Sequence, residues 1–351
     1  MSHLSVALVA FGTVIAMSAP PSTAVASALS NPAAATGPVV RLTKVPPAFT
    51  TDRTPTIHFT VSQPDDQQTP VKVYCADAPN SYPEECASPF TVPIEWSERG
   101  SSVIYVEAID EAGNSSVAVA RWTVDLAAPD LWPVRTPSAI SSDRHTFRWD
   151  ADDAGIGIAS YDTKLSITSQ TAQRMSKRWE SGRLSKPRTT IRVPRGMVAC
   201  LQVRATDRLG NRSSWLRMPC VARSQGHRAL ERRGATRILR DSRYIDGTAI
   251  QIDRGGRVVL RGVQRRSRVI VAYRRHPGGD WFRVRVRGRQ SQWIDVVGTD
   301  VIGTENEPRK GWVEISRTPR RDGPVVIEGH DRARLDGLAV IPPWAFGMPR
   351  R

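Results

Sequence analysis

The sequence contains nearly the same phrase twice, EAIDEAGNS at residues 107–115 and RATDRLGNR at residues 204–212. Before each phrase, apolar and polar residues alternate, which predicts a half-buried β-strand. The Gly-Asn pair inside each phrase tolerates positive backbone φ and predicts a tight turn. Each phrase is therefore expected to close the last hairpin of a β-sandwich, so that the chain contains two sandwich domains in succession.

The two hairpins carry further expectations about register. In the second, Asp207 is expected to accept backbone N–H bonds at the mouth of the loop and to face Ser213. That register places Cys200 opposite Cys220 and predicts a cross-strand disulfide. In the first hairpin, alternation assigns one face of the strand to Val103, Tyr105 and Glu107, and the other to Ile104, Val106 and Ala108.

The remaining cysteines, Cys75 and Cys86, are expected to close a short loop in the first domain. An even, locally paired set of cysteines indicates disulfides in an exported protein. Buried free thiols or a zinc site are the alternatives. Zinc is disfavoured because the sequence has no C-x-x-C pair and no histidine at a completing distance.

The N-terminus predicts export. An apolar run, LSVALVAFGTVIAMSA, is followed by small residues that fit an A-x-A cleavage site, at Ala24 and Ala26 or at Ala26 and Ala28. Residues 1–28 are interpreted as a signal peptide, although no Lys or Arg precedes the run, and an uncleaved anchor is the alternative. The mature chain is expected to be secreted and extracellular, with possible attachment to the cell wall.

Beyond a linker at residues 29–39, residues 40–126 resemble the bacterial Ig-like repeats of exported actinobacterial proteins. The matching features are PTIHFTVS, the first cysteine pair, IDEAGNSS and RWTVD. Residues 128–222 resemble a fibronectin type III-like or Ig-like module, through HTFRWDADDAGIGIASYDTKL and CLQVRATDRLGNRSSW. The resemblance implies a fold, and it says little about function because such modules are spacers and binders with many partners.

The C-terminal third follows a predicted basic linker at residues 223–234. Eight short apolar segments, separated by turns, predict a jelly-roll-like sandwich over residues 235–345, before a basic tail at 346–351. It loosely resembles the terminal jelly rolls that follow Ig-like modules in actinobacterial exported proteins, mainly through RLDGLAV. The whole chain is thus predicted to be all-β: tandem Ig-like or fibronectin type III-like sandwiches followed by a jelly-roll-like sandwich.

Charge points to the same C-terminal region. The formal net charge is +16, and the basic excess lies toward the C-terminus. In WFRVRVRGR, alternation gives one strand face a row of arginines, which is a candidate surface for a polyanion. Nearby tryptophans are candidates for stacking on sugar rings; a solvated sheet face and a tryptophan core are the alternatives. The candidate binding residues are Arg283, Arg285, Arg287, Arg289, Trp281, Trp293 and Trp312.

No catalytic signature is evident. G-x-S-x-G, H-E-x-x-H, a Walker loop and a dinucleotide glycine fingerprint do not occur, and no cofactor or metal is expected. Asp150, Asp152 and Asp153 are interpreted as a solvated turn, because calcium-loop spacing is missing. His276 or His330, with Asp280 or Asp331, would be needed for a hydrolase.

The leading hypothesis is a secreted, non-catalytic binding or adhesion protein. The first two domains would be spacers, and the basic sandwich would contact an anionic envelope polymer or polysaccharide. A structural stalk that binds another surface protein is one alternative, and an unrecognised extracellular hydrolase is another. Nucleic acid is not an expected partner, and no membrane span is expected after signal cleavage.

Overall fold

The computed structural model describes residues 37–63, 70–78, 83–96, 100–176, 178–274, 281–286, 292–295, 310–314, 319–329 and 332–346. The predicted signal peptide, most of the 29–39 linker and residues 347–351 lie outside these ranges. The chain divides into two compact units, residues 1–126 and 127–351. In the described ranges, no helix has the length and apolar character needed to cross a membrane.

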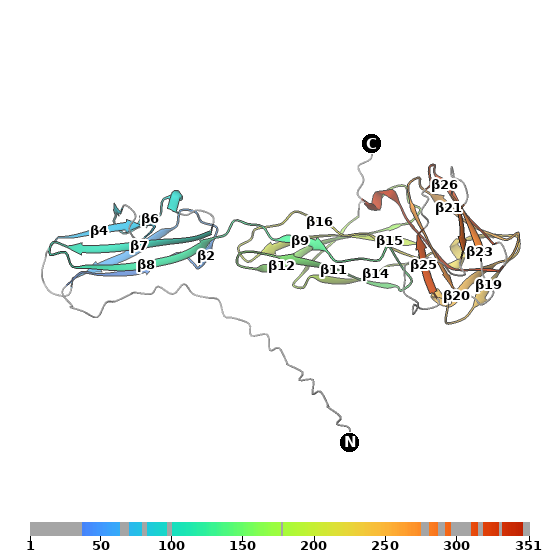
Figure 1. Cartoon of the computed structure of the whole chain (residues 1–351), viewed down its shortest axis with the longest axis horizontal. Helices are drawn as coiled ribbons and strands as arrows, with labels where there is room; N and C mark the ends of the chain where they lie inside the picture. The colour runs from blue at the N-terminus through green and yellow to red at the C-terminus, as the bar shows by residue number, and fades with distance from the viewer. Residues whose placement is uncertain are drawn as a thin grey trace, which may run out of the picture. The chain divides into compact units, whose positions relative to one another are not determined.

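The first unit is a β-sandwich (Figure 1). One sheet has the order β1 (Val39–Lys44), β3 (Thr56–Ser62) and β6 (Phe90–Thr91). The other has the order β2 (Phe49–Thr50), β8 (Ser115–Val124), β7 (Gly100–Asp110), β4 (Val71–Ala76) and β5 (Glu84–Glu85). A 3-10 turn, η1 (Ile94–Trp96), precedes β7. The predicted alternation is confirmed, since the side chains of Ile104, Val106 and Ala108 are fully buried.

The second sandwich repeats this strand order. One sheet contains β14 (Arg188–Arg192), β11 (Arg144–Asp152) and β9 (Asp130–Pro133). The other contains β10 (Ala139–Ile140), β17 (Val221–Arg223), β15 (Met197–Asp207), β12 (Ile158–Ser169) and β13 (Glu180–Leu184), with β16 (Leu216–Arg217) beside β15. In both sandwiches a short early strand pairs in parallel with the last one, β2 with β8 and β10 with β17. The repeated phrase therefore marks a repeated topology.

The repeated phrases form the same loop. The Asp110 carboxylate accepts the Asn114 backbone N–H at 2.8 Å and its side-chain amide at 3.0 Å. The Asp207 carboxylate accepts the backbone N–H groups of Leu209 at 2.9 Å and Asn211 at 2.7 Å. The expected role of Asp207 is confirmed, and in each loop the aspartate ties the turn to the asparagine four residues later.

The expected pairing of Asp207 with Ser213 is wrong. The bridge at the top of the hairpin joins Thr206 to Arg212, and the Ser213 N–H donates to the Ala205 carbonyl at 3.0 Å. The Asp207 N–H donates to the Asn211 carbonyl at 3.1 Å, so the residue opposite Asp207 is Asn211, two residues earlier than predicted. At the base of the hairpin, Val198 pairs with Ala222, which is the register that the prediction requires.

Both predicted disulfides are confirmed. Cys75 bonds Cys86 and links β4 to the segment after β5, with a Cα–Cα distance of 5.8 Å. Cys200 bonds Cys220 and links β15 to the chain before β17, with a Cα–Cα distance of 4.4 Å.

The C-terminal sandwich is a jelly roll, and all eight predicted segments form strands. One sheet has the order β18 (Glu231–Arg233), β21 (Arg257–Val263), β26 (Gly323–Gly329), β23 (Trp281–Val286) and β24 (Gln292–Asp295). The other has the order β19 (Thr236–Arg240), β20 (Thr248–Ile252), β27 (Ala333–Ile341), β22 (Arg268–Arg274) and β25 (Lys310–Glu314). From β20 to β27 the chain crosses repeatedly between the two sheets, which is the jelly-roll path.

The segment predicted as a basic linker, residues 223–234, is structured. It holds the end of β17, the 3-10 turn η2 (His227–Ala229) and β18. Ser224 is fully buried, and the Gln225 N–H donates to the Leu338 carbonyl of β27 at 2.7 Å. Both ends of this segment bond to sheets, so it joins the second sandwich directly to the jelly roll.

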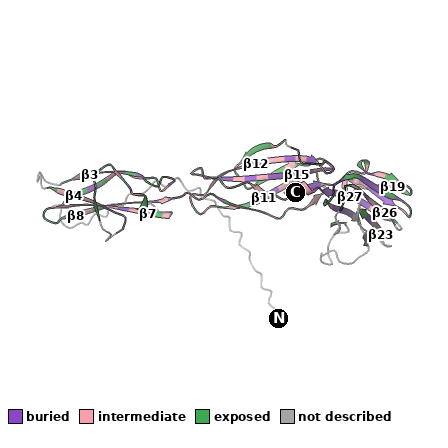
Figure 2. Cartoon of the chain, turned by 90° about the horizontal axis from the view of Figure 1, so that it is seen from above, coloured by how far each residue is buried: buried purple, intermediate pink, exposed green. Residues whose placement is uncertain are grey.

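An apolar contact, the seam, unites these two sandwiches within the second unit. Val198, Cys200 and Ala222 of the second sandwich pack with Ile270, Ala339 and Ile341 of the jelly roll. Figure 2 colours most of β27 as buried, which agrees with the burial of Leu335 through Ile341. In the same region, Gln170 is fully buried and its side-chain oxygen accepts the Val340 N–H at 2.8 Å.

Candidate functional site

The predicted arginine row lies on one outward sheet face of the jelly roll. Val284 is 1% exposed and points into the core, while its neighbour Arg285 is exposed and Arg283 is half-buried. Alternation along a strand puts the two arginines on the face opposite Val284. Arg287 and Arg289 lie outside the described residues.

Strand register extends this row across the sheet. Arg233 pairs with Arg257, Arg257 with Glu328, and Glu328 with Arg283. Directly paired residues of an antiparallel sheet share a face. The surface that results, here called the Arg face, contains Arg233, Arg257, Arg261, Arg283 and Arg285.

Carboxylates neutralise part of the Arg face. Glu231 accepts the Arg261 guanidinium at 2.8 Å and the Arg233 guanidinium at 2.5 Å, and Arg285 bonds Glu328. The hydrogen bonds from Arg261 and then Arg233 lower the pKa of Glu231 below its usual value. In the described part of the sheet, arginines still outnumber glutamates on this face, so it keeps a positive excess.

The strand pairing separates the three candidate tryptophans. Trp281 and Trp293 belong to β23 and β24 of the sheet that carries the Arg face, and Trp293 pairs with Arg283. Trp312 belongs to β25, where it pairs with Ala272 of the other sheet. The three tryptophans are close in sequence but do not form one cluster, because the chain passes from one sheet to the other between β24 and β25.

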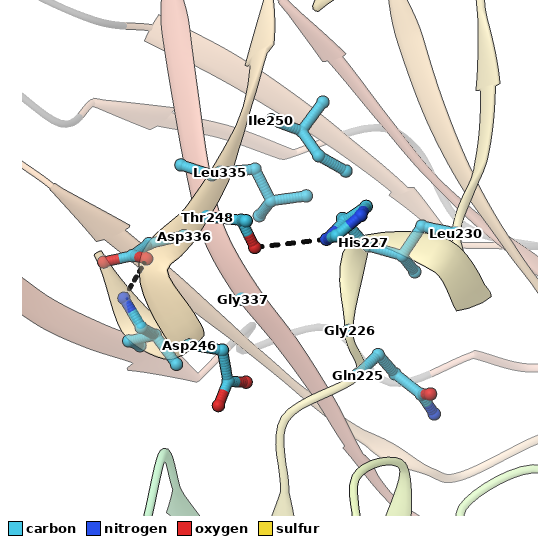
Figure 3. A pocket seen from close by; sticks show the side chains of 12 residues that line it. Gln225, Gly226, His227, Leu230, Asp246, Thr248, Ile250, Leu335, Asp336 and Gly337 are labelled. Carbon is cyan, nitrogen blue, oxygen red and sulfur yellow. Dashed lines mark hydrogen bonds between the residues drawn. The ribbon is translucent and has the colours of Figure 1, made fainter. Parts of the chain in front are cut away.

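The residues of the hydrolase alternative, His276, Asp280, His330 and Asp331, lie outside the described residues. A described histidine, His227, lines a small pocket beside η2 and η3 (Ile245–Gly247) (Figure 3). Its Nδ1 lies 3.1 Å from the Thr248 hydroxyl, and burial, followed by the charges of nearby arginines, lowers the pKa of His227. The pocket encloses about 10 Å³, which is room for about one water molecule and not for a substrate.

The sequence matches no family model and no curated protein. Among solved structures, the fibronectin(III)-like modules of Clostridium thermocellum CbhA are similar at 16% identity and a TM-score of 0.27, covering 53% of this chain and 95% of that chain. A tetra-tandem repeat of a large adhesion protein is similar at 13% identity and a TM-score of 0.23, covering 85% and 74%. Bacteroides ovatus SGBP-B, in complex with a mixed-linkage heptasaccharide, is similar at 10% identity and a TM-score of 0.21, covering 86% and 99%.

The strand order of each domain shows directly that the protein is all-β and built of sandwich modules. At such identities and scores, the similarities to solved structures carry no conclusion about ligand or domain arrangement.

Proposed function

We propose that this chain is a secreted, non-catalytic binding protein of the bacterial cell surface. The Arg face of the jelly roll contacts an anionic envelope polymer or an acidic polysaccharide, and the first two sandwiches act as disulfide-stabilised spacers. The observation that supports this proposal is the cross-strand row of arginines on one sheet face, Arg233 beside Arg257 and then Arg283 beyond the intervening Glu328. Guanidinium groups make forked bonds to carboxylate and phosphate, and a row of them suits a repeating polyanion.

The test is retention of the full chain on isolated bacterial cell envelopes and on immobilised polygalacturonate across a salt series. Wild type is compared with Arg257→Gln/Arg285→Gln, and Arg240→Gln on the other sheet is the matched control. We expect binding that falls with salt, because screening weakens exposed charge pairs, and that falls several-fold in the double variant alone. Retention that is indifferent to salt and to the double variant contradicts the proposal.

A stoichiometric protein partner captured without any glycan dependence would instead support the stalk. Turnover of a polysaccharide would support the hydrolase. Both are outcomes of the same experiment when bound material is eluted and analysed by mass spectrometry.

A further inference from the structure

A second basic site lies between the second sandwich and the jelly roll, away from the Arg face. An open cleft of about 700 Å³ is lined by Ser142, Asp143, Arg192, Arg195, Arg223 and Asp246. These residues come from the loop before β11, the end of β14, the turn after it, the end of β17 and η3. We refer to it as the Arg cleft, and its volume is that of a small-ligand site.

The carboxylates of the cleft are already paired. Asp246 Oδ1 lies 2.8 Å from the Arg195 guanidinium and 3.2 Å from that of Arg223. Asp143 lies 3.2 Å from Arg192 Nε. Because each aspartate is neutralised and arginines outnumber aspartates in the lining, the cleft keeps a positive excess that repels cations and attracts an anion.

Donor groups remain available to such an anion. Arg192 and Arg195 side chains are 80% and 49% exposed, and in the described structure the ion pair of Arg192 uses Nε. Arg223 is only 12% exposed, and its buried Nε has no hydrogen-bond partner among the described residues. Because this Nε has almost no exposed surface, Arg223 adds positive charge to the wall of the cleft, and the open donors are those of Arg192 and Arg195.

Asp246 positions two of these arginines through a strained backbone. Its φ of 58° lies in the left-handed region, which is uncommon for a residue other than glycine. The neighbouring Ile245 N–H donates to the Asp336 carboxylate at 2.6 Å and fixes η3 to β27 (Figure 3). Strain held in place by such a bond often marks a functional site.

We infer that the Arg cleft binds an acidic sugar residue through its carboxylate or phosphate oxygens. The lining contains no aromatic side chain for stacking on a sugar ring, so recognition rests on charge and hydrogen bonds. Ser141 and Ser142 can donate to or accept from sugar hydroxyls. This assignment rests on the proposed function and gives the anionic polymer a defined subsite, separate from the Arg face.

The experiment is calorimetric titration of the full chain at low salt with trigalacturonate, glucose 1-phosphate and neutral maltotriose. The test variant is Arg192→Gln/Arg195→Gln, both of whose side chains are largely exposed, and the control is the exposed Arg188→Gln on the same strand, β14. We expect an acidic ligand to bind and the double variant to weaken it about tenfold or more, with the control unchanged. Arg192→Lys/Arg195→Lys keeps the charge and loses the forked geometry. Its affinity for the acidic ligand should therefore lie between those of wild type and of the glutamine double variant.

Binding of the uronate alone or of the sugar phosphate alone identifies the source of the anionic group. Equal binding of maltotriose, no binding of either acid, or full affinity in the glutamine double variant overturns the assignment. If envelope retention depends on Arg257 and Arg285 while no small acid binds, the cleft assignment fails and the proposed function stands. If an acid binds in the cleft and the chain is not retained on cell envelopes, the proposed function fails and the cleft assignment stands.

Discussion

Strand β7 of the first sandwich and strand β15 of the second hold the same place in the same strand order, yet they are buried differently. Along β7 buried residues alternate with partly exposed ones. Along β15 the residues from Val198 to Leu201 are all buried. The inner face of β15 faces its own sandwich core, through Ala199 and Leu201, and its outer face packs on the jelly roll, through Val198 and Cys200.

The difference shows that one hairpin design can serve two purposes. A strand with one buried face closes a sandwich, whereas a strand buried on both faces also joins two sandwiches into one unit. Consecutive buried apolar residues are the mark of a strand covered on both sides. The disulfide of the second sandwich lies at the same place, since Cys200 and Cys220 both belong to the seam cluster.

The largest expected effect comes from a charge placed on the outer face of each strand. Val198→Asp puts a carboxylate into the seam and is expected to destabilise the second unit by about 4 kcal/mol or more. Val103→Asp, at a half-buried outward position of β7, is expected to cost about 1 kcal/mol or less. Calorimetric unfolding of the full chain measures the loss of stability in both variants. Equal losses would contradict the interpretation that β15 is buried on both faces.

Removal of the disulfides comes next. Loops closed over 11 and 20 residues predict a loss of about 3 kcal/mol for either pair when both cysteines become alanine. The location of the effect should differ: Cys200→Ala/Cys220→Ala should raise hydrogen exchange in β17 and β27, and Cys75→Ala/Cys86→Ala should raise it in β4 and β7. Exchange in β27 that does not respond to the first variant would show that the seam is independent of the disulfide.

A smaller effect is expected from the buried amide of Gln170. Besides Val340, its side chain bonds the Arg223 carbonyl at 2.5 Å and the Gln225 amide at 3.3 Å. Gln170→Ala removes the side-chain acceptor of the buried Val340 N–H and one of the donors to the Arg223 carbonyl, and should cost about 2 kcal/mol. Gln202→Ala, a half-buried glutamine on β15, is the control and should stay within about 0.5 kcal/mol in the same thermal unfolding measurement.

The smallest effect concerns the exposed loop of the first hairpin. The side-chain hydrogen bond from Asn114, aided by backbone N–H groups, lowers the pKa of Asp110. A carboxyl with a lowered pKa in the folded state adds stability above its unfolded pKa and loses it as pH falls through the folded value. Asp110→Asn should therefore flatten the acid limb of the stability curve of the first unit. An acid limb identical to wild type, measured by exchange in β7 from pH 2 to 6, would refute this.

Local patterns were enough to predict the two hairpins, eight strands of the jelly roll and both cysteine pairs, whereas β18 lies in the segment predicted as a linker. Alternation at Ile104, Val106 and Ala108 reports a buried face directly, because the side-chain period of a strand is two. The outward arginines Arg283 and Arg285 follow from the same rule. The register at Asp207 was missed because its side chain bonds the loop, a competition that alternation does not reveal.

The Arg cleft could not be predicted in this way. Arg192, Arg223 and Asp246 belong to separate elements, the ends of β14 and β17 and the turn η3, and each alone is an ordinary polar residue. They meet only because the segment after β17 packs against β27. A signal for that packing was present in the apolar run of Val198 to Leu201, although such a run does not say which surface covers it.

The sequence by itself determined what depends on near neighbours: an all-β chain, two hairpins of one design, two disulfides and a strand with arginines on one face. The tertiary structure decided what depends on residues far apart in the chain. In the tertiary structure Arg257 pairs with Glu328, and Trp312 lies in the sheet opposite that of Trp281 and Trp293. Arg195 and Arg223 both form ion pairs with Asp246. The reason is physical: strand periodicity is a local property of the backbone, whereas the partner of each face is chosen by burial of the whole chain.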